Sequence, residues 1–228
     1  MRQVRGRTAL RKWQSVVLLL AGLLIWQPGT ALDYKAMTEL VAQRWGQTGA
    51  NRVKSWQSML QEGLRPESSD MERLTLVNTF FNKNVRFGSD MEVWEQEDYW
   101  ATPLETLGRG AGDCEDFAIA KYFSLLALGI PDPKLRFVYV RATLQQGQTV
   151  RVEPHMVLAY YKSAGAEPLV LDNLTSIIAI ASQRSDLIPV YSFNKEGYFN
   201  GVLRTAMGRG TRLSRWEDLL VRTANEGF

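Results

Sequence analysis

The stretch Gly-Ala-Gly-Asp-Cys-Glu-Asp-Phe, residues 110–117, decides how this chain of 228 residues is interpreted. Its cysteine, Cys114, stands at the start of a predicted helix that runs from Asp113 to Leu128 and is ended by Gly129 and Pro131. The first turn of a helix carries unpaired N–H groups and the positive end of the helix dipole, and both favour a thiolate. The glycines before the cysteine permit backbone conformations in which a substrate approaches closely. The pattern predicts a nucleophilic cysteine whose own amide is a candidate oxyanion donor.

The chain has one cysteine and one histidine, Cys114 and His155. This excludes internal disulfides and the common zinc sites that are built on several such ligands. An inert cysteine in the core is the alternative to a nucleophile. A structural cysteine has apolar neighbours, whereas this one is bracketed by Asp113, Glu115 and Asp116, so we expect it to be exposed.

His155 and Asp172 are the predicted partners of the thiol. His155 opens the apolar strand of residues 156–161, and Asp172 ends the next strand, residues 169–171. Two neighbouring strands whose ends carry a base and a carboxylate can present both to a helix N-terminus that packs on the sheet. A surface histidine and an Asx turn at Asp172 are the alternatives. The order and spacing of the three residues favour a triad.

The chain changes from helical to strand periodicity along its length, which predicts an α+β fold. Helices are expected at Tyr34–Trp45 and Arg52–Leu60, joined by a turn at Gly46–Gly49, and from Ser69 onward, where Glu72 completes a capping box. Strands are expected at Leu135–Thr143, Val150–Tyr161, Pro168–Asp172, Ile177–Ile180 and Leu187–Phe193.

Residues 86–112 are interpreted as one long loop rich in aromatic side chains. Apolar loops of this length usually line a functional surface. Trp94, Tyr99, Trp100 and Pro103 are therefore predicted to form a wall of the active-site groove, with the Trp100 indole near the oxyanion position.

Residues 1–31 have the layout of a secretory signal peptide, and residues 32–228 are expected to form one domain. Five basic residues precede a short apolar run, Val16–Ile25, and small residues end the segment at Ala31. An uncleaved anchor with Trp13 and Trp26 at the membrane interfaces is the alternative. Export through this leader predicts a periplasmic protein.

The basic net charge gives no reason to expect nucleic acid as a partner. The leader carries five basic and no acidic residues, so its removal changes the formal charge from +3 to −2. A basic segment remains near the C-terminus and leads into a helix predicted from the capping-box spacing of Ser214 and Glu217. Its basic residues are Arg204, Arg209, Arg212 and Arg215. A solvated helix face explains this segment better than a partner site.

The sequence resembles the bacterial transglutaminase-like cysteine proteinases, and within them the periplasmic adhesin proteases. Three blocks carry the resemblance: residues 98–103 (Asp-Tyr-Trp-Ala-Thr-Pro), residues 110–121 around Cys114, and His155 with Leu171-Asp172-Asn173. The resemblance covers residues 33–203 and implies a papain/transglutaminase-like core in which a nucleophile helix packs on an antiparallel sheet. It implies Cys114 as the nucleophile, His155 as the general base and acid, and Asp172 as the residue that orients the imidazole.

The same resemblance implies a substrate and a partner. The substrate is the N-terminal region of a large surface adhesin, cleaved between paired alanines, which releases the cell from its biofilm. The partner is an inner-membrane cyclic-di-GMP receptor that sequesters the protease when the messenger is abundant.

The acids beside Cys114 pose an electrostatic problem, because like charges raise the pKa of a thiol that must ionise. A calcium ion held by Asp113, Glu115 and Asp116 would remove the conflict, and the resemblance implies calcium dependence. Alternatively, these acids only complement the helix N-terminus.

Two other functions stay open at this point. The same triad would serve a transglutaminase or deamidase, in which the thioester forms with a glutamine side chain. A non-enzymatic adaptor domain with a structural cysteine is the second alternative. Labelling of Cys114 by an active-site thiol probe separates the adaptor from both enzymes.

Overall fold

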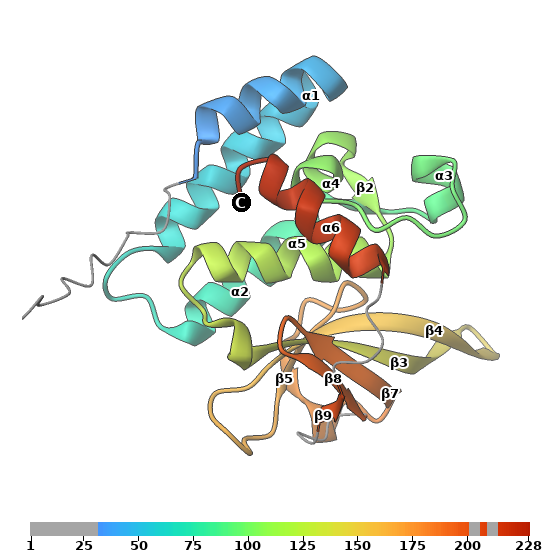
Figure 1. Ribbon diagram of the computed structural model, residues 1–228. Coiled ribbons are helices and arrows are strands. Elements are labelled where there is room, and N and C mark those ends of the chain that lie inside the picture. The colour runs from blue at the N-terminus through green and yellow to red at the C-terminus, as the bar shows by residue number, and fades with distance from the viewer. Residues whose placement is uncertain (1–31, 201–205, 209–213) are drawn as a thin grey trace, which may run out of the picture. The chain divides into compact units, whose positions relative to one another are not determined.

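A computed structural model describes residues 32–200, 206–208 and 214–228 (Figure 1). The predicted leader, residues 1–31, lies outside the described residues. Within the described residues, no helix combines the length and the apolar character needed to cross a membrane.

The described residues form a mixed α+β domain. The helices are α1 (Tyr34–Gly63), α2 (Asp70–Asn84), α3 (Asp90–Trp94), α4 (Pro103–Arg109), α5 (Cys114–Ala127) and α6 (Ser214–Asn225), with 3-10 turns at Asp132–Lys134 and Ala181–Gln183. The strands are β1 (Arg86–Phe87), β2 (Ala111–Gly112), β3 (Leu135–Gln146), β4 (Thr149–Tyr160), β5 (Leu169–Leu171), β6 (Ala179–Ile180), β7 (Leu187–Asn194), β8 (Gly197–Asn200) and β9 (Ala206–Gly208).

The N-terminal helices follow the predicted pattern. α1 is broken at Gly46, whose φ of 72° and ψ of −172° are not helical, so two helices meet there, as the glycines indicated. The second of them begins before the predicted Arg52. α2 starts after Ser69, which caps the helix, and the side chain of Glu72 bonds back to the Ser69 backbone, so the predicted capping box is confirmed.

Residues 86–112 are not the single loop that was predicted. They contain α3, α4 and the short parallel pair β1–β2. Both helices begin with a capping box, Ser89 with Glu92 and Thr102 with Glu105, and each box satisfies end groups that a helix this short leaves unpaired. Five and seven residues are too few for helical periodicity to be visible, so only the caps could have indicated these helices.

The main sheet has the strand order β6-β5-β4-β3-β7-β8-β9, and all neighbours are antiparallel. The five predicted strands are present, while β8 and β9 were not predicted. β3 and β4 form a long hairpin in which Gly147 supplies the positive φ of 62° at the turn.

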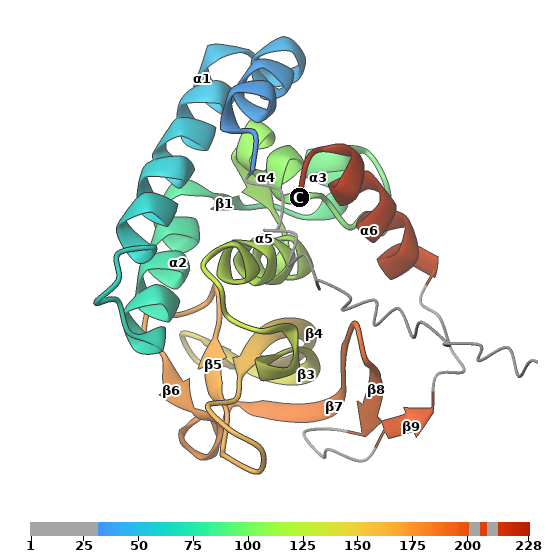
Figure 2. The same ribbon diagram turned by 60° about the vertical axis from the view of Figure 1, so that its left-hand side comes forward.

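The helices cover one face of the sheet, as both views show (Figures 1 and 2). α5 is the centre of this layer, and its residues from Asp116 to Leu125 are all buried. The sheet contributes Phe137, Leu158 and Phe193 to the same core, and Trp216 of α6 packs against Phe137 at 5.1 Å between ring centroids. The C-terminal helix is therefore part of the core of this domain.

Candidate active site

Cys114 is the first residue of α5 and is half-buried, not exposed as expected. Its thiol donates a hydrogen bond to Glu115 Oε2 at 3.0 Å. Burial first, and then the charges of Glu115 and Asp113, raise the pKa of the thiol, while the backbone N–H of Met156 opposes the rise. The conflict inferred from the sequence is therefore real, and burial adds to it.

The two glycines before Cys114, Gly110 and Gly112, have defined roles in the local structure, and their role in the close approach of a substrate stays a prediction. Gly110 ends α4 in the left-handed region, with a φ of 66°. A Cβ on Gly112 would lie 2.6 Å from Asp116 Oδ2, so this glycine is required for the Asp116 side chain to fold back beneath it. In this structure the two glycines serve the local packing of the nucleophile turn.

His155 and Asp172 are brought together. Nε2 of His155 lies 2.8 Å from Oδ1 of Asp172, and the two residues are only 6% and 1% exposed. Asp172 directly follows β5, as predicted, but His155 lies inside β4 and not at a strand end, because β4 continues outward to Thr149 as half of the hairpin. His155 directly precedes Met156, whose backbone N–H is hydrogen-bonded to the Cys114 thiol, so the backbone of β4 at His155 lies close to the nucleophile turn.

Asp172 has hydrogen-bond partners at both carboxylate oxygens and at its backbone carbonyl. Besides His155, the backbone N–H of Leu174 donates to Oδ1 at 3.0 Å, and Arg184 Nη2 donates to Oδ2 at 2.7 Å. Asn82 Nδ2 donates to the Asp172 carbonyl at 2.8 Å. Burial alone would raise the pKa of Asp172, but the bonds from His155, Leu174 and Arg184 outweigh it and hold the pKa well below its ordinary value.

Arg184 is a member of this site that sequence reasoning missed. Its guanidinium also pairs with Asp186 at 2.7 Å, and its side chain is 10% exposed. Arg184 lies 12 positions after Asp172, beyond β6 and a 3-10 turn, so no local pattern in the sequence indicates this contact.

The predicted metal ligands do lie together, with two further acids. Ligand atoms within 4.8 Å of one another occur in overlapping groups made up of Asp90, Asp98, Asp113, Glu115 and Asp116, with the Cys114 thiol in one group. Asp90 and Asp98 were missed because they fall in the segment interpreted as a loop. The capping box that starts at Ser89 was the available signal for Asp90, since it fixes the first turn of α3.

The charges of this acidic cluster are only partly balanced within the described residues, where Arg215 pairs with Asp98 at 2.8 Å. Asp113 precedes α5 but makes no capping hydrogen bond, and both its Oδ1 and that of Asp90 are buried without a partner. Burial, followed by neighbouring charges, raises the pKa of Asp90 to about 6 and that of Asp113 to about 10. Asp113 therefore does not act as a side-chain cap of α5, and the unpartnered oxygens of Asp90 and Asp113 favour a bound cation over acids that only complement the helix N-terminus.

Asp116 lies deepest in the acidic cluster and is held by protein donors. It accepts the backbone N–H of Ala101 at 2.8 Å and the indole N–H of Trp94 at 3.1 Å. Burial still raises its pKa to about 8. Crowded carboxylates with unpaired oxygens suit a hard cation such as calcium, which accepts many oxygen ligands in irregular geometry.

The predicted aromatic wall is only partly present. Trp100 and Pro103 are buried in the core, and the Trp100 ring stacks on Phe193 with 5.8 Å between centroids. Tyr99 bonds Glu105 at 2.8 Å. Of the four residues, Trp94 is the one whose described contacts reach the nucleophile turn, through Asp116.

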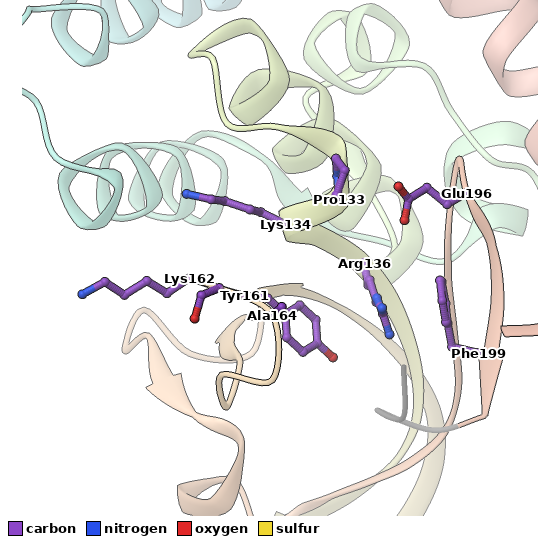
Figure 3. A pocket seen from close by; sticks show the side chains of 9 residues that line it. Pro133, Lys134, Arg136, Tyr161, Lys162, Ala164, Glu196 and Phe199 are labelled. Carbon is purple, nitrogen blue, oxygen red and sulfur yellow. The ribbon is translucent and has the colours of Figure 1, made fainter. Parts of the chain in front are cut away.

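A cavity of about 430 Å³ lies away from the triad (Figure 3). Its lining includes Lys134, Arg136, Tyr161 and Phe199, and the Arg136 guanidinium lies 3.6 Å from the centroid of the Phe199 ring. Tyr161 directly follows the end of β4, and about six residues of extended strand, roughly 20 Å, separate it from His155. Despite its size, this cavity is not where the chemistry lies.

Comparison with known proteins now bears on the site. The family described as bacterial transglutaminase-like cysteine proteinase matches residues 48–189. Comparison with curated protein sequences gives no match. Among solved structures, Legionella pneumophila LapG treated with EGTA is 37% identical, with a TM-score of 0.69 over 83% of this chain and 97% of LapG.

Two further structures of Legionella pneumophila LapG agree. One is 36% identical with a TM-score of 0.68 over 83% of this chain and 97% of LapG. The calcium-bound form is also 36% identical, with a TM-score of 0.68 over 83% and 98%. The match extends over the helix of Cys114 and the strands of His155 and Asp172. The chain belongs to the bacterial transglutaminase-like cysteine proteinase family and is a cysteine peptidase.

Proposed function

We propose that this chain is a periplasmic, calcium-dependent cysteine endopeptidase that cuts the N-terminal region of a large surface adhesin between paired alanines and so promotes detachment from a biofilm. The observation that carries the chemistry is the buried His155–Asp172 pair, 2.8 Å apart, next to the residue whose amide acts on the Cys114 thiol. The resemblance of the sequence to the periplasmic adhesin proteases supports the substrate.

The proposed reaction uses both imidazole nitrogens. Nε2 of His155 is engaged with Asp172, which leaves Nδ1 to accept the thiol proton. The sulfur of Cys114 attacks the scissile carbonyl carbon, and the protonated imidazole gives its proton to the leaving amine. Water then hydrolyses the thioester with His155 as the base, which restores the thiol.

Asp172 fixes the imidazole for both steps. Its low pKa keeps it ionised, so it stabilises the imidazolium without taking the proton. Arg184 and Leu174 hold its two oxygens, so its orientation does not depend on substrate. The backbone N–H of Cys114 is the proposed donor to the oxyanion.

Calcium is proposed at the acidic cluster, with Asp113, Glu115 and Asp116 as ligands and Asp90 added by the structure. The unpaired buried oxygens of Asp90 and Asp113 support it, as does the existence of a calcium-bound form of the similar LapG. A bound calcium ion would supply the positive charge that favours the ionised forms of the carboxylates and of the thiol.

Cleavage of a candidate adhesin is the direct test. Residues 32–228 and the Cys114→Ala variant are incubated with the purified N-terminal region of the adhesin, and the products are sequenced. We expect new termini between paired alanines with the wild type only. Incorporation of an amine without new termini would instead establish the transglutaminase or deamidase alternative, and the absence of either reaction would contradict the enzyme proposal.

Export and partnership are tested separately. The proposal of a cleaved leader predicts that protein from the periplasm begins at Leu32. Membrane-bound protein that begins at Met1 would favour the anchor. Copurification with an inner-membrane cyclic-di-GMP receptor only when the messenger is present would support sequestration, and copurification regardless of the messenger would contradict it.

A further inference from the structure

β4 has one edge that lies open next to the nucleophile. Its neighbour on the side away from β3 is β5, which pairs only with Leu158–Tyr160. Among the described residues, no strand pairs with that edge over the rest of β4, Thr149–Val157. The first six residues of β4 are all exposed. An exposed edge of this length is a template for pairing with another extended chain.

The register identifies which backbone groups face the open edge. Backbone groups of successive strand residues point to opposite sides. The N–H of Tyr161 donates to the carbonyl of Lys134, which directly precedes β3. The backbone N–H and C=O groups of odd-numbered residues of β4 therefore point toward β3, and those of even-numbered residues point toward the open edge. The N–H and C=O groups of Val150 and Val152 therefore lie on the open edge, together with the carbonyl of Pro154.

The open edge leads directly to the catalytic thiol. Met156 is the next even-numbered residue. Its backbone N–H is hydrogen-bonded to the Cys114 thiol, which agrees with the direction assigned from the register. Met156 and Val150 are six residues apart, or about 20 Å of extended chain. A polypeptide lying along the edge would thus be guided into the site over about six of its own residues.

We propose that an extended segment of the polypeptide substrate adds to this edge of β4 as an extra strand, which places its scissile bond at Cys114. The inference rests on the proposed endopeptidase function and adds how the substrate is held. Main-chain hydrogen bonds to Val150, Val152 and Pro154 would supply most of the affinity, as in other cases of strand addition. The substrate segment must therefore be unfolded or unpaired.

The side chains along the edge fit this occupant. Val150 and Val152 are 62% and 59% exposed, although valine is normally buried. They point to the same face of the strand because they are two residues apart. They offer apolar contact to every second residue of an added strand, so small or apolar residues are favoured at those positions.

Pro154 makes the open edge suitable for transient binding. It has no N–H, so one donor is missing from the ladder between the thiol and Val152. Proline within an edge strand discourages permanent pairing with another sheet, including one from a second copy of this chain. A partial ladder allows the cleaved segment to leave.

Hydrogen exchange at the open edge is the first test. The probe is a synthetic peptide of about twelve residues with two central alanines, added to the Cys114→Ala variant of residues 32–228. We expect slower exchange of the Val150 and Val152 amides on binding. The amides of Arg151 and Glu153 face β3 and serve as internal controls that should change little.

Two substitutions at one position separate backbone from side chain. Val152→Pro removes the edge-facing N–H, and an edge strand tolerates proline there. Val152→Thr keeps the N–H and the β-branched shape. We expect Val152→Pro to weaken peptide binding about fivefold, the effect of one hydrogen bond, and Val152→Thr to bind as the parent does. Circular dichroism checks that both variants are folded.

Each outcome decides one of the two proposals. Binding without protection of Val150 and Val152, equal binding by Val152→Pro, or no binding would overturn strand addition. Protection that rises with protein concentration without peptide would assign the open edge to a second copy and also overturn it. Protection with no cleavage by the wild type would overturn the endopeptidase proposal while strand addition stands.

Discussion

The site contains two groups of buried carboxylates, and their pKa values are shifted in opposite directions. Asp172 has a donor at each oxygen, and its pKa lies well below the ordinary value. Asp90 and Asp113 each keep a buried oxygen without a partner, and their pKa values are raised to about 6 and about 10. Burial penalises the charge in both groups, so the supply of donors makes the difference.

The comparison shows which half of the site the protein completes by itself. His155, Leu174 and Arg184 supply what Asp172 needs to stay ionised and oriented. Within the described residues, the acidic cluster is paired with Arg215 at Asp98, while Asp90 and Asp113 each keep a buried oxygen without a partner.

Removing the nucleophile or the base should abolish cleavage. Cys114→Ala and His155→Ala remove the groups that attack and transfer the proton, so we expect losses of at least about a thousandfold in kcat/KM. Asp172→Ala should lose activity less completely, because it orients the imidazole without touching substrate. Melting curves should show that Cys114→Ala remains folded, and wild-type turnover by that variant would refute the assignment.

Removing calcium should silence the enzyme without unfolding it. Excess EGTA is expected to abolish cleavage, calcium to restore it better than magnesium, and Glu115→Gln to reproduce the EGTA result with the thiol present. Calcium at about a hundred times its Kd should also stabilise the fold by about 2.7 kcal/mol, seen as a raised Tm. Glu67→Gln, at an exposed acid outside the cluster, is the matched control. Full activity in EGTA would contradict the cation site.

The chelated protein should lose stability as the pH rises. Asp90, Asp116 and Asp113 have folded-state pKa values of about 6, 8 and 10, whereas an unfolded aspartate titrates near about 4. The folded state therefore binds more protons above pH 4, and the free energy of unfolding falls with increasing pH. Asp172 does not contribute in this range, because its lowered pKa costs stability only in strong acid. We expect Tm in EGTA to fall between pH 5 and pH 8 and calcium to reduce the fall, while Glu226, whose pKa burial raises to about 7 outside the cluster, contributes in both conditions. A rise in EGTA would contradict the assignment.

The contrast also explains what the sequence could predict. Cys114 and His155 are unique in the chain, and Asp172 ends a recognisable strand, so residue type and local pattern identified all three. Arg184 reaches Asp172 only through a tertiary contact, which no spacing rule encodes. The capping box at Ser89 indicates the turn that carries Asp90 but not the contact of Asp90 with the other acids.

The helices and strands likewise divide into those that the sequence predicted and those that it did not. α2 begins with a capping box, α5 is a long and largely buried helix, and both were predicted. α3 and α4 have fewer than eight residues and depend on capping boxes, so they were taken for a loop. β8 and β9 have four and three residues, too few for alternation to be recognised in the sequence.

Substitutions of Arg184 test how far the orientation and ionisation of Asp172 depend on this donor. Arg184→Ala leaves Oδ2 of a buried carboxylate without its donor, so we expect a loss of about 2 kcal/mol of stability in urea and a lower kcat with KM little changed. Arg184→Lys keeps the charge without the forked geometry, so its stability and kcat should lie between those of the wild type and Arg184→Ala. The pH profile of kcat should shift for Arg184→Ala, a readout that a merely structural role would not move. Unchanged stability and profile would show that His155 and Leu174 alone suffice.

The smallest effect is expected at Trp94, whose indole N–H is a protein donor to Asp116 within the acidic cluster. Trp94→Phe keeps an aromatic ring but removes the indole N–H that lies 3.1 Å from Asp116 Oδ2, while Ala101 still holds Oδ1. In EGTA the freed oxygen has no donor, so the fold should lose about 1 kcal/mol. With calcium the loss should be smaller, because a cation at the acidic cluster would satisfy the same oxygen. Urea unfolding of wild type and variant in both conditions measures the difference. An equal loss with and without calcium would show that Asp116 Oδ2 faces no cation, and the ligand set would then have to be drawn from Asp90, Asp113 and Glu115.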